Sequence, residues 1–146
     1  MMERLPRVWE DRFHALAATV ASWSKDPDRK VGAVLISPDK RQVSYGYNGF
    51  PAGLPDNYNI TNAAKQHITV HAELNAILNC PVRPVGWMLF CTSCPCHECA
   101  KAIVQAGITA VYAPAPTPDE ASKWYASQRV GSVIFEAGVQ TFYWET

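Results

Sequence analysis

The chain has 146 residues, 48% of them hydrophobic and 18% charged, so it is long enough for one domain with a hydrophobic core and too short for two ordinary domains. We therefore expect a single domain over residues 1–146. Thirteen basic residues balance thirteen acidic residues, which disfavours a long polyanion such as tRNA or DNA as the partner and leaves a small phosphorylated molecule compatible.

Apolar residues recur at helical spacing over residues 7–24, and two β-rich runs at 31–37 and 42–47 predict a hairpin. A turn at 48–53 opens a long loop that continues to residue 66, and loops of that length are usually functional. The remaining patterns predict, in order, a helix over 71–79, a strand over 86–91, a helix over 96–106, a strand over 108–113, a helix over 119–136 and a strand over 139–144.

This order of elements indicates an α/β protein with one sheet covered by helices on both faces. Neighbouring strands joined by a helix should run parallel, with right-handed crossovers. Ligands in such sheets gather near the strand C-termini and the helix N-termini. Two short polar motifs each open a predicted helix, so we expect the fold to bring these motifs together.

Targeting signals and cysteine spacing bear on the compartment. The N-terminus lacks an apolar segment and no apolar run approaches the ~20 residues that span a bilayer, so we expect neither a signal peptide nor a membrane partner. Four of the five cysteines lie within residues 91–99, and such a tight cluster beside a histidine motif favours metal binding in a reducing compartment over a disulfide scaffold. A cytoplasmic location is therefore expected.

The two motifs are His71-Ala-Glu73 and Pro95-Cys96-His-Glu-Cys99. One imidazole and two thiols with an open fourth position suit a catalytic zinc ion. Cys96 and Cys99 would share one face of a first helical turn, where the helix dipole favours thiolates. Zinc lowers the pKa of a bound water to about 7, and Glu73 would move protons from that water to the ring nitrogen and departing amine of a substrate.

Two other interpretations of these residues stay open. The cysteines could be a buried free pair beside a core histidine. Alternatively, Cys91 or Cys94 could supply a fourth ligand and close a structural zinc site, in which Glu73 would have no purpose.

Longer segments around the motifs carry a family resemblance. The runs HAELNAI from His71 and PCHECAKAIVQAGI from Pro95 resemble the cytidine and deoxycytidylate deaminase superfamily. The GYNGFP run from Gly46, together with CAK and QAGI, is most similar to the deoxycytidylate (dCMP) deaminases. The resemblance covers roughly residues 13–113.

The resemblance implies a cytidine-deaminase-like fold, a three-layer α/β/α sandwich with a five-stranded mixed sheet. It implies hydrolytic conversion of dCMP to dUMP and ammonia, by attack of zinc-activated hydroxide at C4. Residue by residue, it makes His71, Cys96 and Cys99 the Zn²⁺ ligands and Glu73 the proton shuttle. It also implies a homo-oligomer, a hexamer or a dimer.

Several residues are candidates for binding the substrate. Asn48 matches the family's substrate asparagine and could bond the sugar hydroxyl, although it could also only cap its turn. One or two of the polar residues before the first strand should meet the phosphate, while the others form a solvated face. Trp124 or Tyr125 could stack on the base, or pack into the core or an oligomer contact, and Lys123 or Arg129 could contact the phosphate. The candidates taken together are Asn48, Ser24, Lys25, Arg29, Lys30, Ala72, Pro51 and Tyr125.

The substrate and its regulation remain partly open. The same chemistry would serve 5-methyl-dCMP or another C5-modified dCMP, a nucleoside, a free base or tRNA adenosine. Only residues 50–70 separate Gly49 from His71, and His67 is the one further histidine or cysteine suited to a second zinc there. This short segment argues against the control by dCTP and dTTP that longer family members commonly have.

Overall fold

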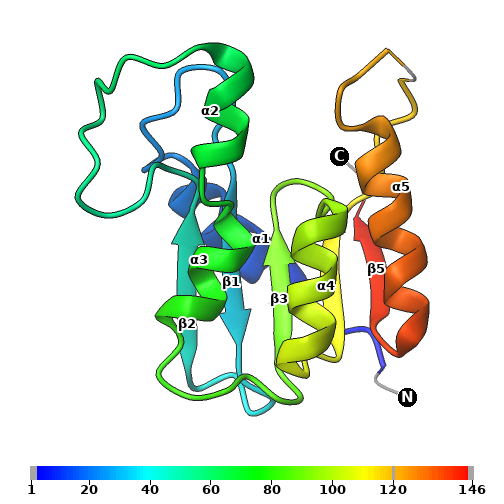
Figure 1. Ribbon diagram of the computed structural model, residues 1–146. Coiled ribbons are helices and arrows are strands. Elements are labelled where there is room, and N and C mark those ends of the chain that lie inside the picture. Colours follow the sequence, from blue (N-terminus) through cyan, green and yellow to red (C-terminus); the bar gives the residue numbers. More distant parts are fainter. Residues whose placement is uncertain (1–2, 120, 145–146) are drawn as a thin grey trace.

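The sheet is the frame on which the two motifs are placed. The computed structural model describes residues 3–119 and 121–144, and within these ranges the sheet is five-stranded with the order β2-β1-β3-β4-β5 (Figure 1). β1 pairs antiparallel with β2 and β3, whereas β3, β4 and β5 run parallel. The predicted mixed sheet and hairpin are therefore confirmed. The strands are β1 (Gly32–Ile36), β2 (Val43–Tyr47), β3 (Met88–Cys91), β4 (Ala110–Pro114) and β5 (Gln140–Trp144).

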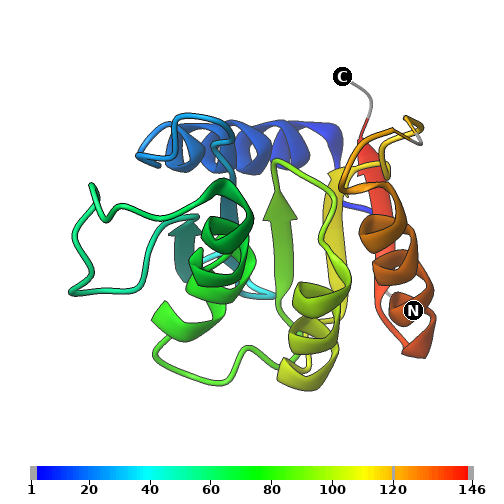
Figure 2. The same cartoon turned by 45° about the horizontal axis from the view of Figure 1, so that its top comes forward.

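Helices cover both faces of this sheet. Figure 2 shows α1 lying across one face, with α3, α4 and α5 on the other. The three-layer α/β/α sandwich expected from the sequence is thus confirmed. The helices are α1 (Arg7–Ala21), α2 (Asn62–Ile68), α3 (Ala72–Asn79), α4 (His97–Ala106) and α5 (Tyr125–Ile134), followed by the short 3₁₀ helix η1 (Phe135–Ala137).

The strands bury both of their faces, because alternate side chains point to opposite sides of a sheet. Val34 and Ile36 of β1 pack with Phe13 of α1 in one core cluster, whereas Ala33 and Leu35 pack in the other cluster, beneath α3 and α4. Such doubly covered strands read as continuous apolar runs, which is why β1 and β3 have no polar alternation.

The packing of α3 on β2 depends on a close approach of the two backbones. A Cβ atom added at Gly46 would lie 2.3 Å from the Ala76 nitrogen and 2.5 Å from the Ala72 oxygen. The missing side chain lets α3 settle directly on the strand, and Ser44 donates a 2.8 Å hydrogen bond to the Ala76 carbonyl beside it. α3 is thereby fixed at the sheet, together with the His71 motif at its N-terminus.

Two sequence predictions were wrong in detail. The segment expected to stay a loop through residue 66 contains α2, whose N-cap Thr61 accepts a 3.3 Å hydrogen bond from the Ala64 amide. The helix expected over 119–136 begins only at Tyr125, because residues 121–124 form turns, and it gives way after Ile134 to the 3₁₀ helix η1. Both differences, a helix within an expected loop and a turn in place of the start of an expected helix, lie at the end of the sheet where the two motifs are (Figure 1).

Candidate active site

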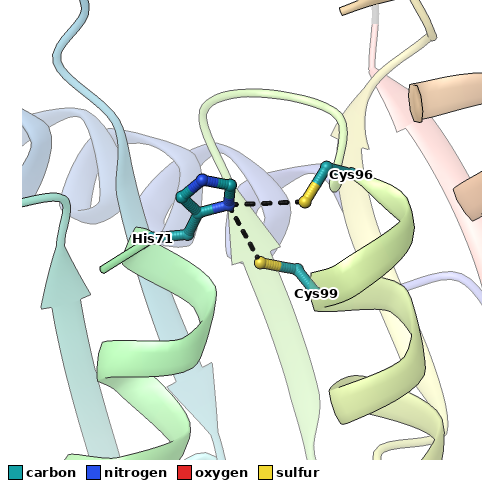
Figure 3. A group of neighbouring side chains, drawn as sticks. All are labelled: His71, Cys96 and Cys99. Carbon is teal, nitrogen blue, oxygen red and sulfur yellow. Dashed lines mark hydrogen bonds between the residues drawn. The ribbon is translucent and has the colours of Figure 1, made fainter. Parts of the chain in front are cut away.

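The two motifs lie at the N-termini of neighbouring helices. His71 is the N-cap of α3 and Cys96 is the N-cap of α4, and both have extended backbone torsions. Glu73 and Cys99 follow in the first turns of these helices. Figure 3 shows the imidazole of His71 pointing from α3 toward the two sulfurs on α4. The expectation that the fold would unite the motifs is confirmed.

The spacing of the three donor atoms fits a zinc ion. The His71 Nδ1 atom lies 3.3 Å from the Cys96 sulfur and 3.4 Å from the Cys99 sulfur, and the three donor atoms all lie within 4.8 Å of one another (Figure 3). Bonds of about 2.0 Å to nitrogen and 2.3 Å to sulfur place tetrahedral N and S ligands about 3.5 Å apart. These three side chains therefore match a zinc site without rearrangement.

The other candidates for metal ligands stay outside this group. Among residues 3–119 and 121–144, the only group of three or more histidines, cysteines or acidic residues close enough to share a metal ion is His71, Cys96 and Cys99. Cys91 and Cys94 are buried free thiols that do not join the group, so a fourth cysteine ligand is not supported. His67 is exposed on α2 and belongs to no second cluster of the described residues.

The electrostatics of the group favour one thiolate before metal binding and raise the pKa of a carboxyl beside it. A hydrogen bond with the Cys99 thiol, assisted by one with His71, lowers the pKa of Cys96 to about 4 against the effect of burial. The pKa of Cys99 is raised, first by the same hydrogen bond and then by burial. Burial also raises the pKa of Glu73, which is only 4% exposed. A raised carboxyl pKa is what general acid–base catalysis near neutral pH requires.

A pocket of about 190 Å³ opens directly over these groups. His71, Glu73 and Cys96 line it from the two helix N-termini, together with the backbone at Ala72. Its other walls come from the loop before β1, from α2 and from the turn before α5. Five stretches of the sequence, the fifth of them at Asn48 after β2, thus meet around one cavity at the end of the sheet.

Arg29 supplies a positive charge to one wall of this pocket. Its Nη2 atom donates a hydrogen bond to the Ser93 hydroxyl, and its guanidinium lies 4.6 Å from the centre of the Trp124 ring. Among the described residues, no carboxylate oxygen comes within 4.0 Å of it to form an ion pair. Burial lowers the Arg29 pKa, although an arginine stays charged at neutral pH. Among the described residues the pocket therefore offers a cation that forms no close ion pair, although Glu73 and Cys96 act on it electrostatically and favour its charged form.

Asn48 lines the pocket while also shaping it. Its Oδ1 accepts a 2.9 Å hydrogen bond from the Val31 amide, and its Nδ2 donates one of 2.8 Å to the Arg29 carbonyl. One lone pair and one amide hydrogen of Asn48 remain for a ligand. Ser24 is buried beneath it, with its hydroxyl donating to the Asn48 carbonyl at 2.8 Å. Ser24 therefore supports the turn and does not line the cavity.

The remaining predicted substrate contacts divide by position. Lys25 forms a surface ion pair of 2.7 Å with Asp56, and Tyr125 lies 4.4 Å from the Arg129 guanidinium, so neither residue lines the pocket. The structure brings five of the predicted residues to the cavity and leaves six outside it. Those at the cavity are Arg29, Asn48, Ala72, Lys123 and Trp124; those outside are Ser24, Lys25, Lys30, Pro51, Tyr125 and Arg129.

Sequence reasoning missed part of the wall. Lys65 of α2 lies 3.0 Å from Asp26 and 3.3 Å from Asp28, and all three residues line the pocket. Ser93 lines it as well and holds Arg29, although these two residues are 64 positions apart. A contact of that sequence separation leaves no local pattern in the sequence.

Comparisons with known proteins agree with this geometry. Residues 7–115 match the family described as the cytidine and deoxycytidylate deaminase zinc-binding region. A protein from Aliivibrio fischeri, described as an uncharacterized deaminase in the luxG 3′ region, is 41% identical over 134 residues, which are 90% of each chain. Human deoxycytidylate deaminase is 40% identical over 111 residues, covering 70% of this chain and 62% of the human protein.

Solved structures agree on the fold. The dCMP deaminase of cyanophage S-TIM5 in complex with dCMP and dUMP superposes with a TM-score of 0.79 at 24% identity, covering 97% of this chain and 100% of that one. Its apo form gives a TM-score of 0.70 at 27% identity, covering 94% and 98%.

Fold and site together define a zinc-dependent deaminase, a hydrolase with the cytidine deaminase fold. The chain belongs to the cytidine and deoxycytidylate deaminase zinc-binding family. No helix within the described ranges is long and apolar enough to cross a membrane.

Proposed function

We propose that the protein deaminates deoxycytidine monophosphate to dUMP and ammonia, with Glu73 as the proton shuttle and Arg29 as a ligand of the phosphate. The observation that carries this proposal is the Arg29 cation, which lies in the same pocket as the metal group and forms no ion pair within 4.0 Å among the described residues. Guanidinium groups bind phosphates strongly, because their N–H donors match the oxygens in geometry and charge. The named dCMP deaminases among the relatives support the same substrate.

Each residue then has a separate task in the reaction. A zinc ion held by His71, Cys96 and Cys99 would supply an activated water at neutral pH. Glu73 would accept a proton from that water as the oxygen adds to C4 of the base. The same carboxyl would pass that proton to the ring nitrogen, then take the second proton from the hydroxyl now on C4 and give it to the amino group, so that the C4–N bond breaks, the carbonyl forms and ammonia leaves.

The remaining walls would position the nucleotide. Asn48 has one donor hydrogen and one lone pair left, which suit a sugar hydroxyl. The Trp124 ring lies 6.2 Å from the His71 ring at an angle of 74°, and it would bound the base beside the metal group. Arg29, stacked on Trp124's indole, would meet the phosphate.

A substrate panel tests the proposal. Ammonia release is measured with dCMP, 5-methyl-dCMP, CMP, deoxycytidine and cytosine, for the wild-type protein and for Arg29→Gln. We expect kcat/KM for dCMP to exceed that for deoxycytidine at least 100-fold. Arg29→Gln should lower the value for dCMP about 100-fold and leave that for deoxycytidine almost unchanged, since hydrogen bonds to charged groups contribute about 1.5–3 kcal/mol each.

A matched charge change provides the control. Arg129→Gln removes the same charge from α5, where Arg129 lies over Tyr125 and away from the pocket. This variant should behave as wild type toward both substrates. Turnover of deoxycytidine or cytosine with none of the monophosphates would overturn the proposed substrate. Efficient turnover of 5-methyl-dCMP without dCMP would move it to a C5-modified nucleotide.

A further inference from the structure

Two neutral side chains contact the Arg29 guanidinium. Ser93 lies in the turn between β3 and α4, and its hydroxyl accepts the hydrogen bond from Nη2. The Trp124 ring lies under the guanidinium, with its centre 4.6 Å away. A carboxylate partner would fix the side chain equally well, but it would also neutralise the charge that an anionic ligand needs. A hydroxyl orients Arg29 and leaves its charge available.

Ser93 is itself held by a buried side chain of the C-terminal helix. Gln128 is 4% exposed, and its Nε2 donates a 3.2 Å hydrogen bond to the Cys94 carbonyl and lies 3.5 Å from the Ser93 hydroxyl. Its Oε1 accepts a 2.9 Å hydrogen bond from the Thr117 amide. This one amide group therefore ties the turn before α4 to the chain that enters α5.

Three residues of α5 and its N-cap approach the pocket wall from one face of the helix. Trp124, Gln128 and Gly131 follow one another at the spacing of one helix face. Trp124 stacks on Arg29, Gln128 anchors the Ser93 turn, and Gly131 lets the helix touch the backbone at Pro95, where an added Cβ would come within 2.7 Å of the carbonyl oxygen. α5 thus braces the anion-binding wall from behind.

We propose that Ser93 and Gln128 are positioning residues that set the Arg29 guanidinium for the phosphate of the substrate, and that they thereby determine the preference for nucleotide over nucleoside. The inference rests on the proposed function. Its physical basis is preorganisation: a long flexible side chain that is already ordered loses less rotamer freedom when the ligand arrives. Neither residue needs to touch the substrate for this role.

A double-mutant cycle tests the proposal on zinc-loaded protein. Ser93→Ala removes the acceptor, Ser93→Thr keeps a hydroxyl, and each is made in the wild-type and in the Arg29→Gln background. We expect Ser93→Ala to raise KM for dCMP about tenfold with kcat almost unchanged and with no effect on deoxycytidine; tenfold corresponds to 1.4 kcal/mol. Ser93→Thr should restore most of the loss. In the Arg29→Gln background, Ser93→Ala should have no further effect, because the residue acts through Arg29.

Gln128→Met is the second variant, since methionine keeps the volume and removes the amide. It should also raise KM for dCMP relative to deoxycytidine, and zinc content and circular dichroism report whether the fold is retained. Equal losses for dCMP and deoxycytidine, or a Ser93→Ala effect that persists without Arg29, would show that Ser93 has only a structural role. Either result would overturn this inference and leave the proposed substrate standing. A wild-type protein with no preference for the monophosphate would overturn both the inference and the proposed substrate.

Discussion

Gly131→Ala is expected to weaken the enzyme although it places a better helix former inside a helix. Gly131 lies in α5, where a Cβ atom would meet the Pro95 carbonyl oxygen at 2.7 Å and the Cys96 carbonyl group at 3.3 Å. Ordinary van der Waals contact begins at 3.4 Å. The obstructing atoms are backbone atoms next to a candidate metal ligand, so they cannot rotate away as a side chain could.

Two effects of opposite sign set the size of the change. Replacing glycine by alanine in a helix interior stabilises the helix by about 1 kcal/mol. Forcing an extra methyl group into a packed contact costs about 1–3 kcal/mol. We therefore expect a net loss of about 1 kcal/mol in the free energy of unfolding. Activity should fall more, about tenfold or beyond, because α5 must move several tenths of an ångström and it carries Trp124 and Gln128 to the pocket wall.

The assay combines denaturant unfolding with kcat/KM for the substrate. Ala126→Gly is the matched control, because Ala126 is exposed on the same helix. It should lose about 1 kcal/mol through helix propensity alone and keep wild-type activity. If Gly131→Ala instead gained about 1 kcal/mol and kept full activity, helix propensity would be the only effect, and the close packing of α5 on the metal helix would be refuted.

Two further predictions concern the metal and pH. Cys96→Ser should lose zinc and, with it, stability, whereas Cys94→Ser should retain about one zinc per chain by metal analysis; the opposite pattern would exchange the two assignments. The Glu10 side chain is 4% exposed and lies 2.6 Å from Arg4, and the hydrogen bond between them is the main cause of its lowered pKa. Its contribution to the free energy of unfolding is therefore present above the usual carboxyl value of 4.5 and is lost as pH falls through the lowered value. The free energy of unfolding should therefore fall more steeply between pH 6 and pH 3 for wild type than for Glu10→Gln. The substitution should cost about 2 kcal/mol at pH 7, and a parallel pH dependence of the two proteins would contradict this.

The sequence predicted the parts of the fold that local pattern determines. The hairpin, the parallel strands and the helices that begin at His71 and Cys96 followed from apolar periodicity and from the position of the motifs. The group of metal-binding side chains was predictable for the same reason, since helix N-termini at the same end of a sheet lie close together. Local signals therefore suffice for the metal group.

The pocket wall depends on contacts that local pattern does not record. α2 is only seven residues long, and its Lys65 forms ion pairs with Asp26 and Asp28, which join segments far apart in the chain. Charge alone did not distinguish Arg29 from its neighbour Lys30; what separates them is the hydroxyl of Ser93 and the ring of Trp124, both distant in sequence. Substrate-binding residues were consequently the part least predictable from sequence.

The central claim is that a metal group and a separate proton shuttle carry out deamination in one pocket. The most direct measurement determines zinc content and ammonia release from dCMP in the same samples of wild-type protein and Glu73→Gln. We expect about one zinc per chain in both, and a rate at least 100-fold lower in Glu73→Gln, because the amide cannot accept and return the proton. A Glu73→Gln protein that lost its zinc, or one that kept its zinc and turned over dCMP at the wild-type rate, would contradict the account.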